Sequence, residues 1–429
     1  MKKGPLLVSA GRTGGANQAM LRHREALASV GIDSPLLLGE ELRPGFSGRF
    51  VHAMLKLVEQ APIAEIRLTH SGSRPSYFEF EAIPALSSAL PVVMRLSDMN
   101  PFTGFCPYSY GCERWKRNCF PCPMISGKHA HLREIRAPNS RRAVAREFSK
   151  KRKAFENASV HVVAPSAWMA GHIKESVMAP ALQSLTIIPP FALPRRFIEP
   201  SMKTSYRERL GIRQESKVIC VIAPSPRNYR KGFDFIPLLM AKMRPIANLT
   251  WVIVGNDVLG PSFEGHRIVS IPRQTDERSL AELLSVADFH LMPSRADNSS
   301  QILVESLAAA TPSICFDVGG NAEIIVHGQT GFVIEPYNLM ALKSVLEHQL
   351  DLTNTVAFQS MRRACYERAE YKYGQSAHLD KFLKLYERVN PEGNWANVPV
   401  ANTPLTDSGL SCYPELSGGL VRMRKFFEG

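Results

Sequence analysis

Two carboxylates stand eight residues apart in a segment with the pattern of a strand, a polar loop and a helix. Asp297 follows an apolar run, and Glu305 lies further along the helix that comes next. The start of that helix, at Ser299, Ser300 and Gln301, would offer unpaired backbone N–H groups and the positive end of the helix dipole, which suit a diphosphate. From these positions one carboxylate could meet a sugar and the other a ribose.

Two further features suit the binding of phosphate. Lys231 follows an apolar run and precedes a glycine, and its ammonium group is a flexible point charge. Gly14 and Gly15 open a helical pattern directly after the first apolar run of the chain. Because glycine has no Cβ, the backbone there can approach a phosphate closely. Neither feature is specific by itself.

Four cysteines, Cys106, Cys112, Cys119 and Cys122, fall within seventeen residues in the spacing C-x5-C-x6-C-x2-C. Four thiols this close suit a tetrahedral zinc site, and the terminal C-x2-C pair has a common ligand spacing. We expect a structural zinc ion here, with an iron–sulfur cluster as the alternative. The remaining cysteines are scattered and indicate packed or surface thiols.

The elements that must position these residues are short apolar runs that alternate with helical patterns. Such a series predicts parallel sheets covered by helices on both faces. The series stops and restarts once, so we expect an α/β protein with two Rossmann-like, doubly wound domains that face each other across a cleft. The predicted strands are 5–10, 34–38, 65–69, 91–96, 160–164, 184–188, 217–222, 251–255, 267–271, 289–293, 313–317 and 331–334.

Prolines punctuate the chain near 189–200, where the first series ends, and place the domain boundary there. The expected division is an N-terminal domain (1–195) with a cysteine-rich insertion (106–122), a second domain (196–375), a C-terminal helix (376–390) and a poorly structured tail (391–429).

The chain is basic, with 52 Lys and Arg against 39 Asp and Glu. Ten basic and three acidic residues give 128–156 a local charge of +7, and part of it forms an amphipathic helical pattern with Val144, Phe148 and Phe155 on one face. This helix could rest on an anionic membrane, or its apolar stripe could pack on its own sheet. No signal peptide or spanning stretch is apparent. We therefore expect a cytoplasmic protein, peripheral at the inner face of the membrane if the first interpretation holds.

The segment from Asp297 to Glu305 resembles the signature of family 4 (group 1) of the retaining glycosyltransferases, which has the GT-B fold. The continuations VESLAAATP (304–312), FDVGGNAEII (316–325) and HGQTGF (327–332) are also similar to that family. The resemblance implies a UDP- or GDP-linked sugar donor whose anomeric configuration is retained. It also implies that 196–375 is the nucleotide-sugar-binding domain and that 1–195 lies on the acceptor side. It implies that Glu305 binds the donor ribose and Asp297 approaches the donor sugar, while Lys231 and the loop at Gly14 and Gly15 bind the phosphates. No catalytic metal is implied.

The block DMNPFTG (98–104), GCERWK (111–116) and CFPCP (119–123) resembles the colanic acid and exopolysaccharide subgroup of this family. That resemblance implies a glycan or lipid-linked glycan acceptor in surface polysaccharide biosynthesis. The chain departs from the pattern at Ser97, where a His is usual, at Asn100, where a Trp is usual, and at Ser225, where an Arg is usual. Arg227 is the candidate replacement for that Arg. These departures leave open the alternative that the protein is a glycosyltransferase relative that has lost catalytic turnover.

A different class of function is a basic, zinc-containing nucleic-acid-binding protein. It would explain the charge and the four cysteines, but not the segment from Asp297 to Glu305. Neither a helix-turn-helix nor a stacking platform is visible in the sequence. We therefore expect no nucleic-acid partner.

Overall fold

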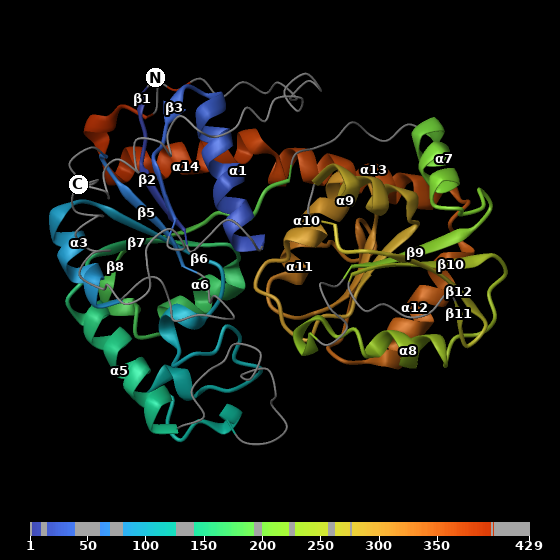
Figure 1. The fold of residues 1–429 in the computed structure, drawn as a ribbon, viewed down its shortest axis with the longest axis horizontal. Coiled ribbons are helices and arrows are strands. Elements are labelled where there is room, and N and C mark those ends of the chain that lie inside the picture. The colour runs from blue at the N-terminus through green and yellow to red at the C-terminus, as the bar shows by residue number, and fades with distance from the viewer. Residues whose placement is uncertain are drawn as a thin grey trace.

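The computed structural model describes residues 2–9, 15–38, 61–68, 80–125, 141–192, 200–222, 228–255, 262–274, 277–395 and 398. These residues form two separate, mainly parallel β-sheets, each with helices on both of its faces (Figure 1). The first sheet belongs to the first half of the chain and the second sheet to the second half.

Six parallel strands make up the first sheet as far as the chain is described, in the order β4-β2-β5-β6-β7-β8. One face packs on α1 and α14, and the other on α3, α5 and α6. The strands are β2 (Leu6–Ser9), β4 (Leu36–Leu38), β5 (Ala64–Leu68), β6 (Val92–Leu96), β7 (Val160–Ala164) and β8 (Leu182–Ile187). The helices are α1 (Gly15–Ser29), α3 (Ile83–Ala89), α5 (Arg141–Glu156), α6 (Ala167–Lys174) and α14 (Gln375–Val389).

Within the described ranges the second sheet has the order β11-β12-β10-β9-β13-β14-β15, and only its edge pair β11-β12 is antiparallel. Its strands are β9 (Lys217–Ile222), β10 (Leu249–Val254), β11 (Ser262–Phe263), β12 (His266–Ile271), β13 (Phe289–Met292), β14 (Ser313–Phe316) and β15 (Gly331–Ile334). The helices are α7 (Pro200–Arg209), α8 (Phe235–Met240), α9 (Glu277–Val286), α10 (Gln301–Ala308), α11 (Asn321–Ile324), α12 (Leu339–Asp351) and α13 (Val356–Tyr373).

The predicted fold class is confirmed. Each of the twelve predicted strands is found, and each begins and ends within two residues of its prediction. The edge strand β11 and the two-stranded pair of β1 (Lys2–Lys3) with β3 (Ile32–Asp33) were not predicted. Two-residue strands carry no periodic signal, so the sequence pattern does not reveal them.

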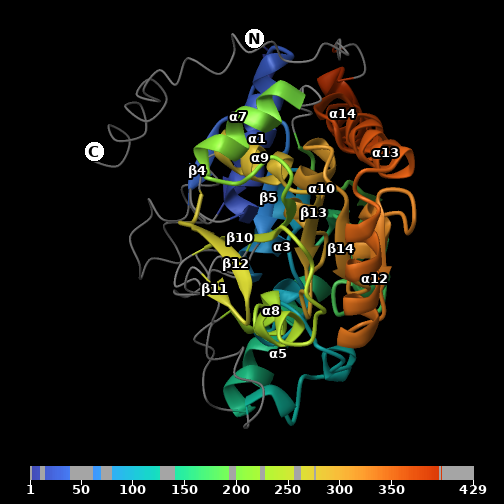
Figure 2. The same cartoon turned by 90° about the vertical axis from the view of Figure 1, so that its right-hand side faces the viewer.

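The chain returns to the first sheet at its end. Helices α13 and α14 follow each other along one side of the molecule (Figures 1 and 2). α13 packs on α10 of the second domain, whereas α14 places Leu379, Phe382 and Tyr386 in the core of the first. Beyond α14, Trp395 is fully buried against Tyr386, and Lys2 lies over its indole ring. Trp395, in the segment expected to be a poorly structured tail, is therefore packed, and 399–429 lies outside the described residues.

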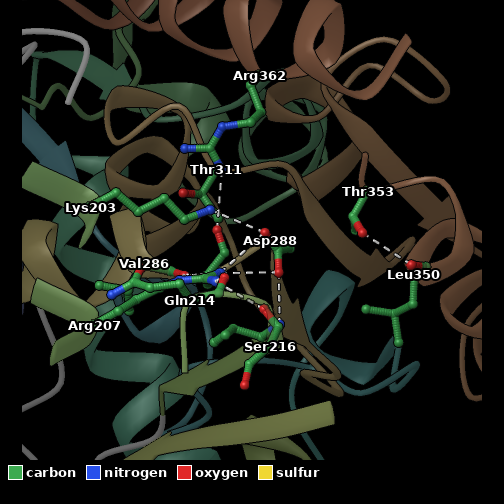
Figure 3. A network of polar contacts seen from close by, with 12 residues as sticks. Lys203, Arg207, Gln214, Ser216, Val286, Asp288, Thr311, Leu350, Thr353 and Arg362 are labelled. Carbon is green, nitrogen blue, oxygen red and sulfur yellow. Dashed lines mark hydrogen bonds and ion pairs between the residues drawn. The ribbon is translucent and has the colours of Figure 1, made fainter. Parts of the chain in front are cut away.

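A buried polar network fastens α7 to the second sheet (Figure 3). Lys203 Nζ lies 3.1 Å from Asp288 Oδ1, and Arg207 Nη2 lies 3.3 Å from Asp288 Oδ2. The same carboxylate accepts the N–H of Val218 at the start of β9, at 2.8 Å. Arg207 also donates to the carbonyl oxygens of Ser216, just before β9, and of Val286, at the end of α9, so its charge is well compensated in the interior.

The basic helix α5 packs on its own domain through its apolar stripe. Val144, Phe148 and Phe155 lie in the core, so these side chains cannot insert into a membrane. Lys151 is also buried, and its Nζ donates to the carbonyl oxygens of Asn100, Thr103 and Gly104 at 2.8, 3.0 and 3.2 Å. The packing interpretation of the stripe therefore holds, and Lys151 anchors the loop that leads to the cysteines.

We expect Lys151→Met to lower the free energy of unfolding by about 3 kcal/mol, because it leaves buried carbonyl oxygens without their charged donor. Chemical denaturation followed by circular dichroism measures the change. The matched control is Lys150→Met, since Lys150 is exposed and should change stability by about 0.5 kcal/mol or less. Equal effects of the two substitutions would contradict the anchoring role.

Candidate functional site

The second sheet has a topological switch point between β9 and β13. From β9 the chain moves outward to β10 and β12, then crosses to β13 on the other side of β9. In open α/β sheets, ligands bind outside the carboxyl ends of the strands at such a point. Lys231 follows β9, in the short 3-10 helix Tyr229–Lys231, and Asp297 follows β13. The sheet therefore brings together two residues that the sequence assigned to one site.

Asp297 is buried in an ion triad with two neighbouring cations. Its Oδ2 atom accepts hydrogen bonds from Lys231 Nζ at 2.9 Å and from Arg230 Nη1 at 3.0 Å. The guanidinium of Arg230 also lies 5.1 Å from the ring centre of Tyr108, which belongs to the first half of the chain. The triad carries one net positive charge, so it suits an anionic ligand.

Two glycines allow the chain to reach this geometry. Gly232 has a φ of 64°, and a Cβ on it would lie 1.9 Å from the carbonyl oxygen of Pro293. Gly319 has a φ of 59°, and a Cβ on it would lie 1.5 Å from the carbonyl oxygen of Asp297. Any other residue would clash with the loop after β13 at both positions. The two glycines therefore allow the backbone to pack closely against the loop of Asp297 on two sides.

The triad sets the charge states of its members. Burial alone would raise the pKa of Asp297, but Lys231 and Arg230 hold this pKa below its ordinary value. Asp297 is therefore ionised at neutral pH and acts only as an acceptor. Burial lowers the pKa of Lys231, and the Asp297 carboxylate opposes that shift. The protonation of Lys231 thus depends on having an anion beside it.

Glu305 lies on α10 and contacts the first domain. Its Oε1 atom accepts hydrogen bonds from Arg22 Nη2 of α1 at 2.9 Å and from Gln301 Nε2 at 3.2 Å. Gln301 Nε2 also donates to the carbonyl oxygen of Phe191, in the segment between the two sheets, at 3.0 Å. The structure therefore places Glu305 where α10 meets α1.

The predicted phosphate contacts at the start of α10 are only partly available as side chains. Ser300 precedes the helix without capping it, and its Oγ contacts Met292 Sδ at 3.2 Å. The side chain of Gln301 already donates to Glu305 and to the carbonyl oxygen of Phe191, and Ser299 is half-buried. What this segment offers an anion is therefore chiefly the backbone N–H groups of the first helical turn.

Several predicted positions near the N-terminus and in the second domain lie outside the described residues. These are Gly14, Ser225 and Arg227, so no contact is assigned to them. Gly15 is the first residue of α1.

Polar contacts join the ends of the two sheets next to Asp297. Asn298 Nδ2 donates to the carbonyl oxygen of Ser97 at 3.1 Å, and its Oδ1 accepts from Ser166 Oγ at 2.9 Å. Glu323 accepts the backbone N–H groups of Ala167 and Trp168, the first residues of α6, at 2.7 and 2.8 Å. The carboxylate of one domain thus lies at the positive end of a helix of the other.

The structure does not show the predicted zinc site. Among the described residues, no group of three or more His, Cys, Asp or Glu side chains is arranged to hold a metal ion. Cys119 and Cys122 are buried in the apolar core of the first domain, and Cys119 Sγ accepts the N–H of Gly104 at 3.3 Å. Cys106 and Cys112 pack against the same core. All four cysteines thus pack in or against this core, and their role as metal ligands stays a prediction.

Comparison with known proteins decides the family of the second domain. Residues 202–371 match the family described as Glycosyl transferases group 1. This segment is a group 1 glycosyltransferase domain. D-inositol 3-phosphate glycosyltransferase of Jonesia denitrificans is 26% identical over 231 residues, which cover 50% of this chain and 52% of that protein. The chain therefore matches about half the length of this curated relative.

Solved structures show that the fold extends beyond the group 1 domain. Sucrose-phosphate synthase from Thermosynechococcus elongatus aligns with a TM-score of 0.65 and 15% identity, over 91% of this chain and all of that one. Anabaena HepE in complex with UDP aligns with a TM-score of 0.59 and 15% identity, over 90% and 100% of the chains. The predicted GT-B architecture is confirmed.

Sequence reasoning missed the partners of the predicted site residues. Arg230 stands next to Lys231 and could have been considered as a second cation, but Arg22 and Tyr108 lie in the other domain. No local signal in the sequence connects them with the group 1 domain. The contact of Asn298 with Ser97 of the first domain was likewise not predicted.

Proposed function

We propose that this protein is a retaining glycosyltransferase that moves a sugar from a UDP- or GDP-linked donor to a hydroxyl acceptor. The observation that carries the proposal is the triad of Asp297, Lys231 and Arg230 at the switch point of a group 1 domain. Anabaena HepE, which shares the fold, binds UDP. A relative without turnover would keep the same triad, so donor binding and transfer need separate measurements.

In the proposed reaction Lys231, Arg230 and the N–H groups at the start of α10 stabilise the diphosphate as it leaves. Fixed positive groups aimed at developing negative charge act without reorganisation, so they favour the transition state. Asp297 approaches the donor sugar, and Glu305 binds the ribose hydroxyls. A departing phosphate oxygen takes the proton of the acceptor hydroxyl, so the reaction needs no pair of carboxylates of the kind that hydrolases use.

The finer proposal for the acceptor is a glycan or lipid-linked glycan of surface polysaccharide biosynthesis. It rests on the resemblance of the segment around Asp98 and the four cysteines to the exopolysaccharide subgroup. Within the described part of the chain, no helix is long and apolar enough to cross a membrane. Attachment to a membrane would therefore use the exposed basic face of α5, which includes Lys150, Arg152 and Lys153.

We expect Lys231→Ala to raise the Kd of UDP about ten- to a hundredfold, because one charge-assisted hydrogen bond is lost. The Kd of uridine should change much less, since uridine has no phosphate. Isothermal titration calorimetry measures both constants. Lys242→Ala removes an exposed lysine of the same domain and is the matched control. Unchanged UDP affinity in the Lys231 variant would remove this residue from the phosphate site.

A second test uses pH and the variant Asp297→Asn. Asp297 raises the pKa of Lys231 against the effect of burial, so its loss should lower that pKa further. Protonated Lys231 is the form that binds phosphate, so UDP affinity should fall as pH rises. In the variant the fall should begin at a lower pH than in the wild type. Measurements above about pH 7 avoid the last ionisation of the phosphate. Parallel pH profiles of the two proteins would contradict the coupling.

Membrane attachment is tested by co-sedimentation with vesicles. The proposal predicts binding to anionic but not neutral vesicles, and weaker binding at high salt. Replacing Lys150, Arg152 and Lys153 by Gln should weaken binding about a hundredfold, at about 1 kcal/mol for each charge near the surface. Lys151 is left unchanged because it is buried.

The control for this experiment removes the same charge from exposed positions of the second domain, at Arg213, Lys242 and Arg363. It should bind anionic vesicles as the wild type does. Equal losses in both triple variants would show a nonspecific effect of net charge, and equal recovery in the supernatant with both lipids would end the membrane proposal.

A further inference from the structure

Two buried polar atoms without hydrogen-bond partners lie at the carboxyl ends of neighbouring strands of the first sheet. They are Nε of Arg67, near the end of β5, and Oγ of Ser97, one residue past the end of β6. β5 and β6 are paired in parallel with Arg67 opposite Arg95, so Ser97 follows Arg95 by two residues on the adjacent strand. Buried polar groups are rarely left unpaired, so these two atoms are candidates for binding a ligand.

The charges around Arg67 favour an anionic ligand. Burial contributes most to lowering the pKa of Arg67, and Arg95 and Arg22 lower it further, whereas Glu65 and Asp98 oppose the shift. Glu65 is already bound to Arg95, at 2.8 Å, and to Tyr386. In the part of the chain that the structure describes, no carboxylate forms an ion pair with Arg67. A partly buried cation that has no ion-pair partner is stabilised when an anion arrives.

The chemistry of the two side chains narrows the class of ligand. A guanidinium presents its N–H groups as a planar fork that fits two oxygens of a phosphate or a carboxylate. The hydroxyl of Ser97 can donate to a further oxygen of the same group. Ser97 also stands where the resembled subgroup usually has a His, so this departure changes the chemistry of the site at this position.

The position of Ser97 links this pair to the proposed reaction. Its carbonyl oxygen accepts from Asn298 Nδ2 at 3.1 Å, and Asn298 follows Asp297, the residue proposed to approach the donor sugar. The donor phosphates already have Lys231 and Arg230 on the other domain. Arg67 and Ser97 therefore lie on the acceptor side of the place proposed for the sugar.

We propose that Arg67 and Ser97 bind an oxyanion of the acceptor, so that the acceptor is a hydroxyl compound carrying a phosphate or carboxylate group. This inference rests on the proposed glycosyltransferase function and names its class of acceptor. The oxyanion belongs either to a small molecule in solution or to the headgroup of a lipid, and the chemistry at Arg67 is the same in both cases.

The test is a calorimetric titration of inorganic phosphate into the full-length protein saturated with UDP, at constant ionic strength. Wild-type protein should bind phosphate while UDP stays bound. Arg67→Gln should weaken phosphate binding about tenfold or more, and should leave the Kd of UDP unchanged. Arg152→Gln, an exposed arginine of α5, is the control and should match the wild type for both ligands.

Ser97→Ala keeps the proposal testable if Arg67→Gln does not fold. It removes one neutral hydrogen bond and should weaken phosphate binding about fivefold, with UDP affinity unchanged. Wild-type affinity for phosphate in either folded variant, or no phosphate binding by the wild type, overturns the inference. Displacement of UDP by phosphate also overturns it, because the anion would then occupy the donor site.

The same experiments separate this inference from the proposed function and identify the source of the oxyanion. If UDP does not bind, the proposed function fails, and the phosphate titration of the UDP-free protein still tests Arg67. Glucose 6-phosphate should bind more tightly than glucose if the ligand is a soluble phosphate. Preferential binding to phosphatidylinositol vesicles over phosphatidylcholine vesicles, lost in Arg67→Gln, would identify a lipid headgroup.

Discussion

An ionised carboxylate is buried at the end of β13 because two cations lie within 3.0 Å of it. Removing Asp297 from water costs several kcal/mol, and only close, well-oriented charges compensate for that cost. Lys231 and Arg230 can be this close because β9 and β13 are neighbours in the sheet and because Gly232 permits contact between their loops. The order of the strands thus decides the electrostatics of the site. The net positive charge that remains on the triad then favours the binding of an anion at this site.

The two domains meet through directed polar contacts near this triad. Helix α13 holds the carbonyl oxygen of Glu323 with donors from Arg368, Lys372 and Tyr373. That fixes the residue whose carboxylate binds the start of α6 in the first domain, beginning at Ala167. Contacts of this kind are exchanged for water at small cost, unlike a large apolar interface. Relative motion of the domains is therefore the default expectation for such an interface.

The sequence predicts best what depends on short-range pattern. Continuous apolar runs predicted every strand of both sheets longer than two residues, because strands buried on both faces leave a signal along the chain. The contact between Asp297 and Lys231 agrees with the sequence analysis, because the family resemblance assigned both residues to the donor site. The contacts of Arg22 with Glu305 and of Arg230 with Tyr108 could not be predicted, because they join residues far apart in the sequence. The cysteine spacing indicated a metal site that the structure does not show.

Helix α1 connects Glu305 of the second domain with the core of the first domain. Arg22 reaches Glu305, whereas the next residue, His23, lies in a buried network with His378 and Tyr386 of α14. Glu65 completes this network. Burial would raise its pKa, but His23 and Arg95 lower the pKa to about 2, so the carboxylate is ionised.

Two partners of this network come from α14, which explains why the chain returns to the first sheet after the second domain is complete. Without α14, Glu65 and His23 would lose buried hydrogen-bond partners, and the interior would hold unpaired polar groups. Helix α1 would then lose contacts that hold its position, and the contact of Arg22 with Glu305 depends on that position. Helix α14 thus supports the position of Glu305 in the second domain through the core of the first domain.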